Sequence, residues 1–194
     1  SPFGTADIKT ALHGRFNAFN VTAAVVAVTG LGFSFTEVAN AASHLLPVDG
    51  RMQEVKGGSD IRVVVDYAHT PDALASALSA LKQSCIGALW VVFGCGGDRD
   101  AGKRPEMGRI ADSLADQLVV TNDNPRSESP EIIVEDILVA ITRSACHVEF
   151  DRGAAIRYAV LNARPGDTVL VAGKGHENYQ LVGKNKLDFS DVSS

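Results

Sequence analysis

The sequence predicts an α/β protein with a Rossmann-like, doubly wound and mostly parallel sheet. After about residue 50, apolar runs of strand length alternate with segments of helical apolar spacing, which is typical of parallel strands joined by right-handed crossovers. One run, residues 89–93, is apolar throughout, as expected of a strand buried on both faces. Glycines and then alternating charges follow it directly. They indicate a loop at the carboxyl end of the strand, where open α/β sheets bind ligands.

Length and composition limit the class of protein. The 194 residues, 45% of them hydrophobic and 21% charged, suit one soluble globular domain, or one domain and a piece of another. The net charge of −5 argues against a nucleic-acid partner. No apolar run approaches the ~20 residues of a membrane span, and the first residues do not resemble a signal peptide. The three cysteines lack CxxC spacing, which favours a reducing cytoplasm over a disulfide framework or a zinc site.

The first part of the chain predicts a turn and a weak strand, followed by two helices. The expected positions are residues 1–12 for the turn and strand, and residues 20–31 and 35–46 for the helices. Asn17 or Asn20 suits the N-cap of the first helix, and Gly30 suits its end. Pro47 and Gly50 then break the pattern. We therefore expect a domain boundary there, between residues 1–46 and residues 47–194.

The second part of the chain alternates between strands and helices. Strands are expected at residues 52–56, 61–67, 88–93, 117–121, 147–150 and 168–172. Helices are expected after Pro71 and at residues 105–115, 131–144 and 153–163. The segment YQLVGKNKLDFS predicts a hairpin that turns at residues 183–185 and adds an antiparallel edge to the sheet. The tail, residues 191–194, is expected to fray.

Four loops that follow strands carry most of the unusual chemistry of the chain. They are DYAHTPD (66–72), GCGGDRDAGKRP (94–105), NDNPR (122–126) and GKGHE (173–177). Because parallel strands end at the same edge of a sheet, all four loops are expected to open there.

Polar side chains of both signs at this edge indicate a zwitterionic or phosphorylated ligand. Arg99 and Arg126 can each clamp a carboxylate through two parallel hydrogen bonds. Asp123 and Glu177 can hold an ammonium group, and Gly173 lets a ligand approach the backbone closely.

Each loop also has a plainer interpretation. His69 suits a helix cap, residues 123–125 are a common turn sequence, and His176 with the glutamate after it suits a surface pair. Cys95 is a candidate nucleophile, but no histidine stands beside it, and we favour a small residue tolerated in a tight loop. The GKG at 173–175 lacks the spacing of a phosphate loop.

Six motifs together resemble the Mur ligases of peptidoglycan synthesis. They are GRFNAFN (14–20), DGRM (49–52), DYAHTPD, FGCGGDRDAGKRP (93–105), NDNPR and AGKGHENYQ (172–180). Within that family they are similar to the type that adds 2,6-diaminopimelate to UDP-N-acetylmuramoyl-L-alanyl-D-glutamate. Those enzymes have three domains. The resemblance implies that residues 1–46 are the tail end of the central ATP-binding domain and that residues 47–194 are the C-terminal domain, which binds the incoming amino acid.

The resemblance also implies an activity and a set of site residues. In the family, ATP and Mg²⁺ convert a substrate carboxylate into an acyl phosphate, which the amine of the amino acid attacks. The implied contacts to meso-diaminopimelate are Arg99, Asp123, Asn124, Pro125, Arg126, Gly173 and Glu177. The implied ATP contacts are Asn17, Asn20, Arg51, Asp66 and His69, and no metal ligand is assigned in this chain. The phosphate loop and the carbamylated lysine of the family have no match here, so the chain alone is expected to be inactive.

Alternatives remain open at this point. A lysine-adding Mur ligase and a folylpolyglutamate synthase relative belong to the same class; Arg126 argues against the first and the GCGGDRD loop against the second. A non-catalytic nucleotide-binding Rossmann module would carry GxGxxG after its first strand, where this chain has DYAHTPD. The expected partners are small molecules, namely meso-diaminopimelate, the UDP-MurNAc-dipeptide and ATP, bound by a cytoplasmic monomer.

Overall fold

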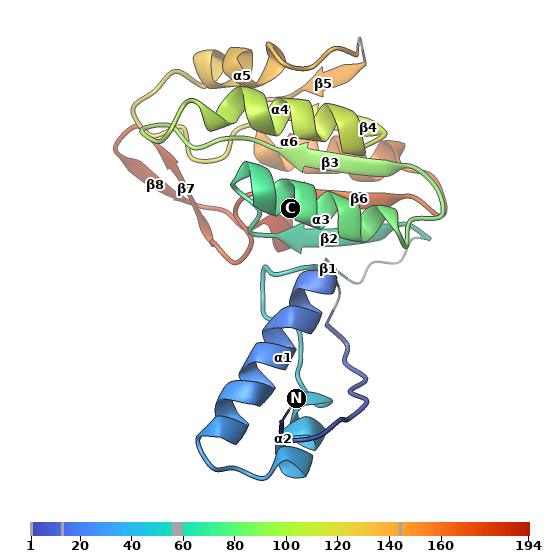
Figure 1. Cartoon of the computed structure of the whole chain (residues 1–194). Coiled ribbons are helices and arrows are strands. Elements are labelled where there is room, and N and C mark those ends of the chain that lie inside the picture. The colour runs from blue at the N-terminus through green and yellow to red at the C-terminus, as the bar shows by residue number, and fades with distance from the viewer. Residues whose placement is uncertain (1, 13, 56–59, 144) are drawn as a thin grey trace. The chain divides into compact units, whose positions relative to one another are not determined.

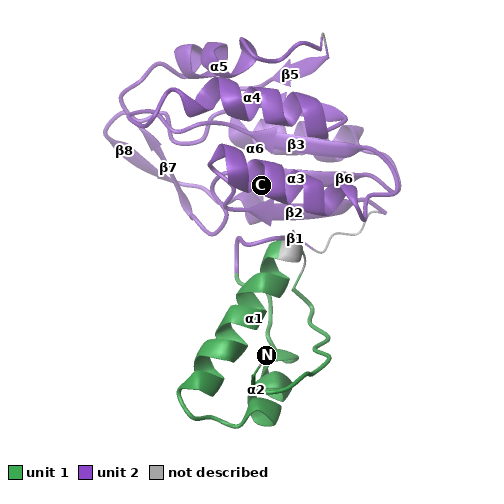
Figure 2. Ribbon diagram, in the orientation of Figure 1, with its two compact units in different colours: residues 1–48 green, residues 49–194 purple. Residues whose placement is uncertain are grey.

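The computed structural model describes residues 2–12, 14–55, 60–143 and 145–194. The chain forms two compact units, Ser1–Val48 and Asp49–Ser194, which Figure 2 shows in different colours. Residues 56 and 144, at the ends of a predicted strand and a predicted helix, lie outside the described residues. Among the described residues, no helix is long and apolar enough to cross a membrane.

The first unit contains two helices, α1 (Arg15–Gly30) and α2 (Phe35–Ala42). The buried side chains of Val21, Val25 and Ala42 form its small core. The weak strand predicted within residues 1–12 is wrong, since the described residues 2–12 contain no strand. A strand needs a partner for its backbone groups, and the described part of this unit offers none.

Both helices of the first unit differ from their predicted bounds. Helix α1 begins at Arg15 because Gly14 has a φ of 91°, a left-handed conformation that ends the preceding segment. Asn17 and Asn20 therefore lie within the helix, and neither is its N-cap. Helix α2 stops at Ala42, four residues before the predicted end. The side chains of Ser43 and His44 both bond the carbonyl oxygen of Asn40, at 2.6 and 2.9 Å, and so satisfy the last turn.

The second unit has a six-stranded sheet in the order β1-β2-β6-β3-β4-β5 (Figure 1). The strands are β1 (Gln53–Val55), β2 (Arg62–Asp66), β3 (Leu89–Phe93), β4 (Gln117–Val120), β5 (Cys146–Val148) and β6 (Thr168–Ala172). Strand β1 pairs antiparallel with β2, and all other neighbours are parallel. Strands β3 and β6 are buried along their whole length, as their apolar sequences require. The predicted mostly parallel, doubly wound sheet is confirmed.

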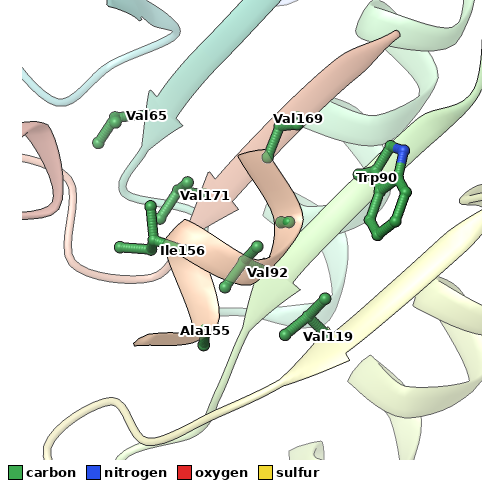
Figure 3. Packing of buried hydrophobic residues seen from close by; sticks show 9 residues of the cluster. Val65, Trp90, Val92, Val119, Ala155, Ile156, Val169 and Val171 are labelled. Atoms are coloured by element: carbon green, nitrogen blue, oxygen red, sulfur yellow. The ribbon is translucent and has the colours of Figure 1, made fainter. Parts of the chain in front are cut away.

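Helices cover both faces of this sheet. They are α3 (Pro71–Lys82), α4 (Lys103–Leu114), α5 (Pro130–Leu138) and α6 (Arg152–Asn162). Helices α3, α4 and α5 lie side by side on one face, and α6 covers the other (Figure 1). Figure 3 shows the core beneath α6, where Ala155 and Ile156 pack on alternate residues of the central strands, such as Val92 and Val171.

Helix α5 ends at Leu138, well before the predicted residue 144. The chain turns back toward α4 instead, because Asp112 on α4 accepts hydrogen bonds from Thr142 Oγ1 at 2.7 Å and from Arg143 Nε at 2.6 Å. These side-chain bonds hold the segment after α5 as a loop.

The C-terminal hairpin forms between β7 (Tyr179–Val182) and β8 (Asn185–Asp188), as predicted. It does not extend the main sheet, so the expected antiparallel edge is wrong: the hairpin is a separate two-stranded sheet, and β1 is the antiparallel edge strand. Arg126 joins the hairpin from the loop after β4. Its N–H donates to Leu181 O at 3.1 Å, and its carbonyl accepts from Gly183 N at 2.7 Å.

The tail is ordered, which corrects the expectation that it frays. Asp191–Ser193 forms a short 3₁₀ helix, and Asp191 is 4% exposed. Its carboxylate pairs with the guanidinium of Arg152 at the start of α6, with distances of 2.7 and 2.8 Å to Nε and Nη2. A carboxylate buried in this way needs such a partner, and a frayed tail would leave Arg152 without it.

Candidate functional site

Four loops meet around one cavity at the carboxyl ends of the parallel strands, as the sequence predicted. The cavity has a volume of about 540 Å³. Its lining residues from these loops are Tyr67, His69 and Thr70; Gly94, Cys95, Gly96, Arg99, Asp100 and Lys103; Asp123, Asn124 and Arg126; and Gly173 and Glu177. Tyr179 of β7 completes the wall. Six of the seven residues assigned to the amino acid thus line one cavity; Pro125, the seventh, is buried beside them in the chain.

Asp123 and Gly173 face each other at this edge. Asp123 follows β4 and is 8% exposed, while Gly173 follows β6 with a φ of 121°. The positive φ favours glycine at position 173, and a Cβ there would stand 2.6 Å from Asp123 Oδ2, so the carboxylate would have to move. The carbonyl of Asp123 accepts from Gln180 Nε2 at 2.7 Å, which ties the loop to β7.

Asn124 and Glu177 are joined by the buried side chain of Lys174. Lys174 Nζ lies 3.0 Å from Asn124 Oδ1 and 3.0 Å from Glu177 Oε2. Asn124 Nδ2 donates to the same Glu177 oxygen at 3.0 Å. The three side chains therefore form a closed set of hydrogen bonds between the loops after β4 and β6.

Arg126 lies across the glycine turn after β3. Its Nη1 donates to Gly97 O at 2.7 Å and to Asn124 O at 3.4 Å, and its backbone φ is 53°. Among the described residues these are its only guanidinium hydrogen bonds, and the side chain lines the cavity. The group can therefore offer its remaining N–H donors to an anion.

Arg99 and Lys103 complete the basic part of the lining. Arg99 is exposed, with Nη1 3.0 Å from Asp98 O. Lys103 Nζ donates to His69 O at 2.9 Å, so it connects the loop after β3 with the loop after β2. Acidic and basic side chains thus both line the cavity, which suits a ligand that carries both charges.

The loops after β3 and β4 brace each other. Asp98, with a φ of 53°, accepts from Ser127 N at 3.2 Å and from Ser127 Oγ at 2.6 Å. The hydrogen bonds from Ser127 lower the pKa of the Asp98 carboxyl. Arg104, which is 1% exposed, bonds both oxygens of Glu128 and one of Asp136. This bracing sets the positions of Arg99 and Arg126.

Cys95 lines the cavity but is not suited to be a nucleophile. It is 3% exposed, and its thiol is directed at Met107 Sδ, 3.6 Å away. Burial raises the pKa of Cys95 to about 12, so the thiol stays protonated at neutral pH. The interpretation as a small residue in a tight loop fits this geometry better.

The residues assigned to ATP occur in both units. Asn17 and Asn20 lie on α1 of the first unit. In the second unit, Tyr67 is contacted by Arg51, 4.8 Å above its ring, and by the His69 ring at 4.5 Å. His69 Nδ1 is also 2.8 Å from Tyr67 O. Arg51 and His69 are exposed and available to a ligand.

Asp66 is held differently from Arg51 and His69. It is 8% exposed, and its Oδ2 accepts from Met52 N at 2.8 Å. Burial raises the pKa of Asp66 above its ordinary value, against the opposing effect of the bond from Met52. Among the described residues, no group of three or more His, Cys, Asp or Glu side chains could hold a metal ion.

Comparison with known proteins identifies the family. The family model described as "Mur ligase, glutamate ligase domain" matches residues 50–175, more than half of the chain. This chain belongs to the Mur ligase family. It is 51% identical over 193 residues to the UDP-N-acetylmuramoyl-L-alanyl-D-glutamate–2,6-diaminopimelate ligase of Chromobacterium violaceum, and 49% identical over 193 residues to the ligase of the same name from Vibrio vulnificus. These matches cover 98% and 99% of this chain but 39% of each relative, so the chain spans well under half of their length.

Solved structures agree with the family. One structure of a UDP-N-acetylmuramoyl-L-alanyl-D-glutamate–2,6-diaminopimelate ligase matches with a TM-score of 0.74 and 42% identity, covering 100% of this chain and 40% of that one. The UDP-N-acetylmuramate–alanine ligase from Thermotoga maritima matches with a TM-score of 0.69 and 22% identity, over 88% of this chain and 37% of that one. At that identity the second match shows a shared fold alone.

Sequence reasoning missed two residues of this Mur ligase that the structure places behind the lining. Lys174 and Arg152 are both almost fully buried, at 0% and 1% exposure. Arg152 bonds Ala172 O at 3.0 Å and Asn122 O at 3.3 Å, in addition to Asp191. Burial alone would lower the pKa of Arg152. The charge and hydrogen bonds of Asp191 more than offset this effect, so the pKa of Arg152 lies above its ordinary value. The available signal for Lys174 was a lone lysine between two glycines, and Arg152 gave none.

Proposed function

We propose that this chain is the amino-acid-binding part of an ATP-dependent ligase that adds meso-diaminopimelate to UDP-N-acetylmuramoyl-L-alanyl-D-glutamate. The observation that carries the proposal is the composition of the cavity, in which Arg99 and Arg126 line the same space as Asp123 and Glu177. Meso-diaminopimelate carries two carboxylates and two ammonium groups. Two guanidinium groups and two carboxylates can therefore each bind one of its charges. The lining also contains Lys103 and Asp100, which bond the backbone at His69 O and Gly102 N.

Four charged groups of the lining have a proposed role. Arg99 and Arg126 each bind one carboxylate of the amino acid, and Asp123 and Glu177 hold its ammonium groups. Asn124 and Gly173 offer an amide and a close backbone approach, and Pro125 fixes the turn that presents them. By orienting the amino acid, these residues would direct its amine at the acyl phosphate of the other substrate.

ATP would supply the activated carboxylate of the second substrate. We assign Arg51 and His69, which are exposed, to the nucleotide, together with Asn17 and Asn20 of the first unit and Asp66. The buried Asp66 acts in this proposal through its hold on Met52 N, beside Arg51. Mg²⁺ accompanies ATP in the proposed reaction, and we assign no residue of this chain to it.

The proposal favours diaminopimelate over lysine because of Arg126. Lysine lacks the distal carboxylate and would leave this half-buried guanidinium without an anionic partner. The relatives at about half identity are diaminopimelate ligases by name, which supports the same choice. We further propose that the ligase acts as a monomer on small molecules in the cytoplasm.

Steady-state kinetics of the full-length ligase test this function. We expect Arg126→Ala to lower kcat/KM for meso-diaminopimelate. The loss of transition-state stabilisation should be roughly 2–4 kcal/mol, the scale of a truncated charge pair, and the loss for lysine should be far smaller. Arg99→Ala should lower kcat/KM for both amino acids, since Arg99 binds a carboxylate that they share. Arg109→Ala, an exposed arginine of α4, is the matched control and should change neither. Equal losses for the two amino acids with Arg126→Ala would contradict the assignment.

A further inference from the structure

Lys174 is a fully buried cation in a loop that otherwise borders the cavity. Its exposed fraction is 0%, although Gly173 before it and Glu177 after it both line the cavity. A lysine loses several kcal/mol of hydration on burial, and good partners must offset that loss. Its Nζ has two of them, Asn124 Oδ1 and Glu177 Oε2, each at 3.0 Å.

The bonds of Lys174 determine how the Asn124 amide is oriented. Asn124 Oδ1 accepts from Lys174 Nζ and also from Leu181 N at 2.9 Å. Two donors thus occupy both lone pairs of this oxygen. A flipped amide would turn its own NH₂ toward the same two donors and lose both bonds. Lys174 therefore helps to direct Asn124 Nδ2 toward Glu177.

The same cation also orients the Glu177 carboxylate. Lys174 Nζ and Asn124 Nδ2 both donate to Oε2 of Glu177, each at 3.0 Å. Among the described residues no donor bonds Oε1, and Glu177 lines the cavity. One oxygen is therefore held by the protein, while the other is left for a ligand.

We propose that Lys174 is a positioning residue for the amino-acid site, one that holds Asn124 and Glu177 in the arrangement that receives an ammonium group of the ligand. This inference rests on the proposed function. Without Lys174, Glu177 would lose the cation that holds Oε2, and Asn124 could turn over. The site would then keep its residues but lose the single orientation in which Glu177 faces the ligand.

A double-mutant cycle in the full-length ligase separates this role from simple support of the fold. The variants are Lys174→Met, Glu177→Gln and the combination, with Lys184→Met in the exposed hairpin turn as the matched control. We expect Lys174→Met to raise KM for meso-diaminopimelate about tenfold, within the range for residues of one hydrogen-bond network, and KM for ATP less than about twofold. In the Glu177→Gln background the same substitution should raise KM for meso-diaminopimelate less than about threefold, because the carboxylate that Lys174 holds is already replaced.

Two results would overturn the role of Lys174 and leave the proposed function standing. One is that Lys174→Met raises KM for meso-diaminopimelate equally in the wild-type and Glu177→Gln proteins. The other is that it raises the KM values for diaminopimelate and ATP equally. A wild-type ligase that does not turn over meso-diaminopimelate would overturn the proposed function as well. If Lys174→Met does not fold, as shown by thermal unfolding, the same cycle is run with Lys174→Gln. That variant keeps a donor but removes the charge, and the same two results decide the outcome.

Discussion

At the scale of single residues, the site depends on positions where one side chain fits and another does not. Gly173 has a φ of 121°, and a Cβ there would approach Asp123 Oδ2 to 2.6 Å. An added Cβ would therefore displace the carboxylate, while the bond from Gln180 to the Asp123 carbonyl holds the backbone of its loop. The glycine therefore does more than permit a turn: it keeps the space in front of a buried carboxylate.

We therefore predict that Gly173→Ala impairs both stability and binding. The strained backbone should lower the free energy of unfolding by about 1–3 kcal/mol. Displacement of the Asp123 carboxylate should weaken the binding of meso-diaminopimelate, as measured by calorimetric titration of the full-length ligase. Gly30→Ala is the control, since a Cβ at the end of α1 meets nothing within 4 Å, and it should leave binding unchanged. Wild-type affinity in Gly173→Ala would show that Asp123 is not displaced.

The residue scale also shows what a sequence can predict about a site. Arg126 and Asp123 were predictable because they follow a recognisable strand, and strand ends gather at one edge of the sheet. Lys174 was not, because the direction of a side chain between two glycines depends on their φ values, which are 121° for Gly173 and 54° for Gly175. Both conformations are open to glycine, so no local rule decides which neighbour faces the cavity.

At the scale of elements, a buried aspartate fastens the turn before β6 to β3. Asp167 accepts hydrogen bonds from Ala88 N at 2.7 Å, Trp90 Nε1 at 3.0 Å and Arg164 N at 2.9 Å. Burial alone would raise the pKa of Asp167, but these bonds outweigh it and lower the pKa below the ordinary value of 3.8. The ionised form is therefore the one that holds the two strands in register.

The sign of this shift gives a prediction about acid stability. A carboxyl with a lowered pKa contributes stability above its unfolded value of 3.8, and this contribution is lost as the pH falls through the folded pKa. Asp167→Asn replaces the charged acceptor with a neutral amide and should lower the free energy of unfolding by about 1–3 kcal/mol at pH 7. The loss should be smaller below pH 3.8, where the wild-type carboxyl itself becomes protonated. Urea unfolding at pH 7 and pH 3 measures the difference, with the exposed Asp188→Asn as control. A cost that does not change with pH would contradict this role of the charge.

The elements themselves were predicted well where their pattern is local. Strands β3 and β6 and helix α3 follow directly from apolar runs and apolar spacing. The end of α5 was not predictable, since it depends on bonds from Thr142 and Arg143 to Asp112, about thirty residues away. The hairpin was predicted, but its separation from the main sheet was not, because a hairpin sequence does not specify a further partner.

At the scale of the whole molecule, the tail closes the second unit through one buried ion pair. Arg152 and Asp191 are 39 residues apart, and both side chains have 0% exposure. Arg152 also bonds Ala172 O at the end of β6 and Asn122 O in the loop after β4. A composition or a local pattern cannot indicate such a pair, which explains why fraying was expected instead.

Removing one member of this pair should be costly. We predict that Asp191→Ala lowers the free energy of unfolding by about 3–5 kcal/mol, because it leaves the Arg152 charge buried without its partner. The double variant Arg152→Met with Asp191→Ala should recover part of this loss, since no unpaired charge remains. Denaturant unfolding of the four proteins measures the coupling. Strictly additive losses would mean that the two side chains do not depend on each other.

The attachment of Arg126 to the β7–β8 hairpin has a consequence for protein engineering. Its N–H and carbonyl are bonded to Leu181 and Gly183. The backbone of this residue therefore pairs with the edge of a hairpin that lies almost sixty positions later in the chain. A two-stranded hairpin alone is marginally stable, and here the loop and the hairpin support each other. Amino-acid preference should therefore not transfer between ligases when residues 122–126 are exchanged by themselves. The transplantable cassette is discontinuous: it consists of that loop together with residues 179–188.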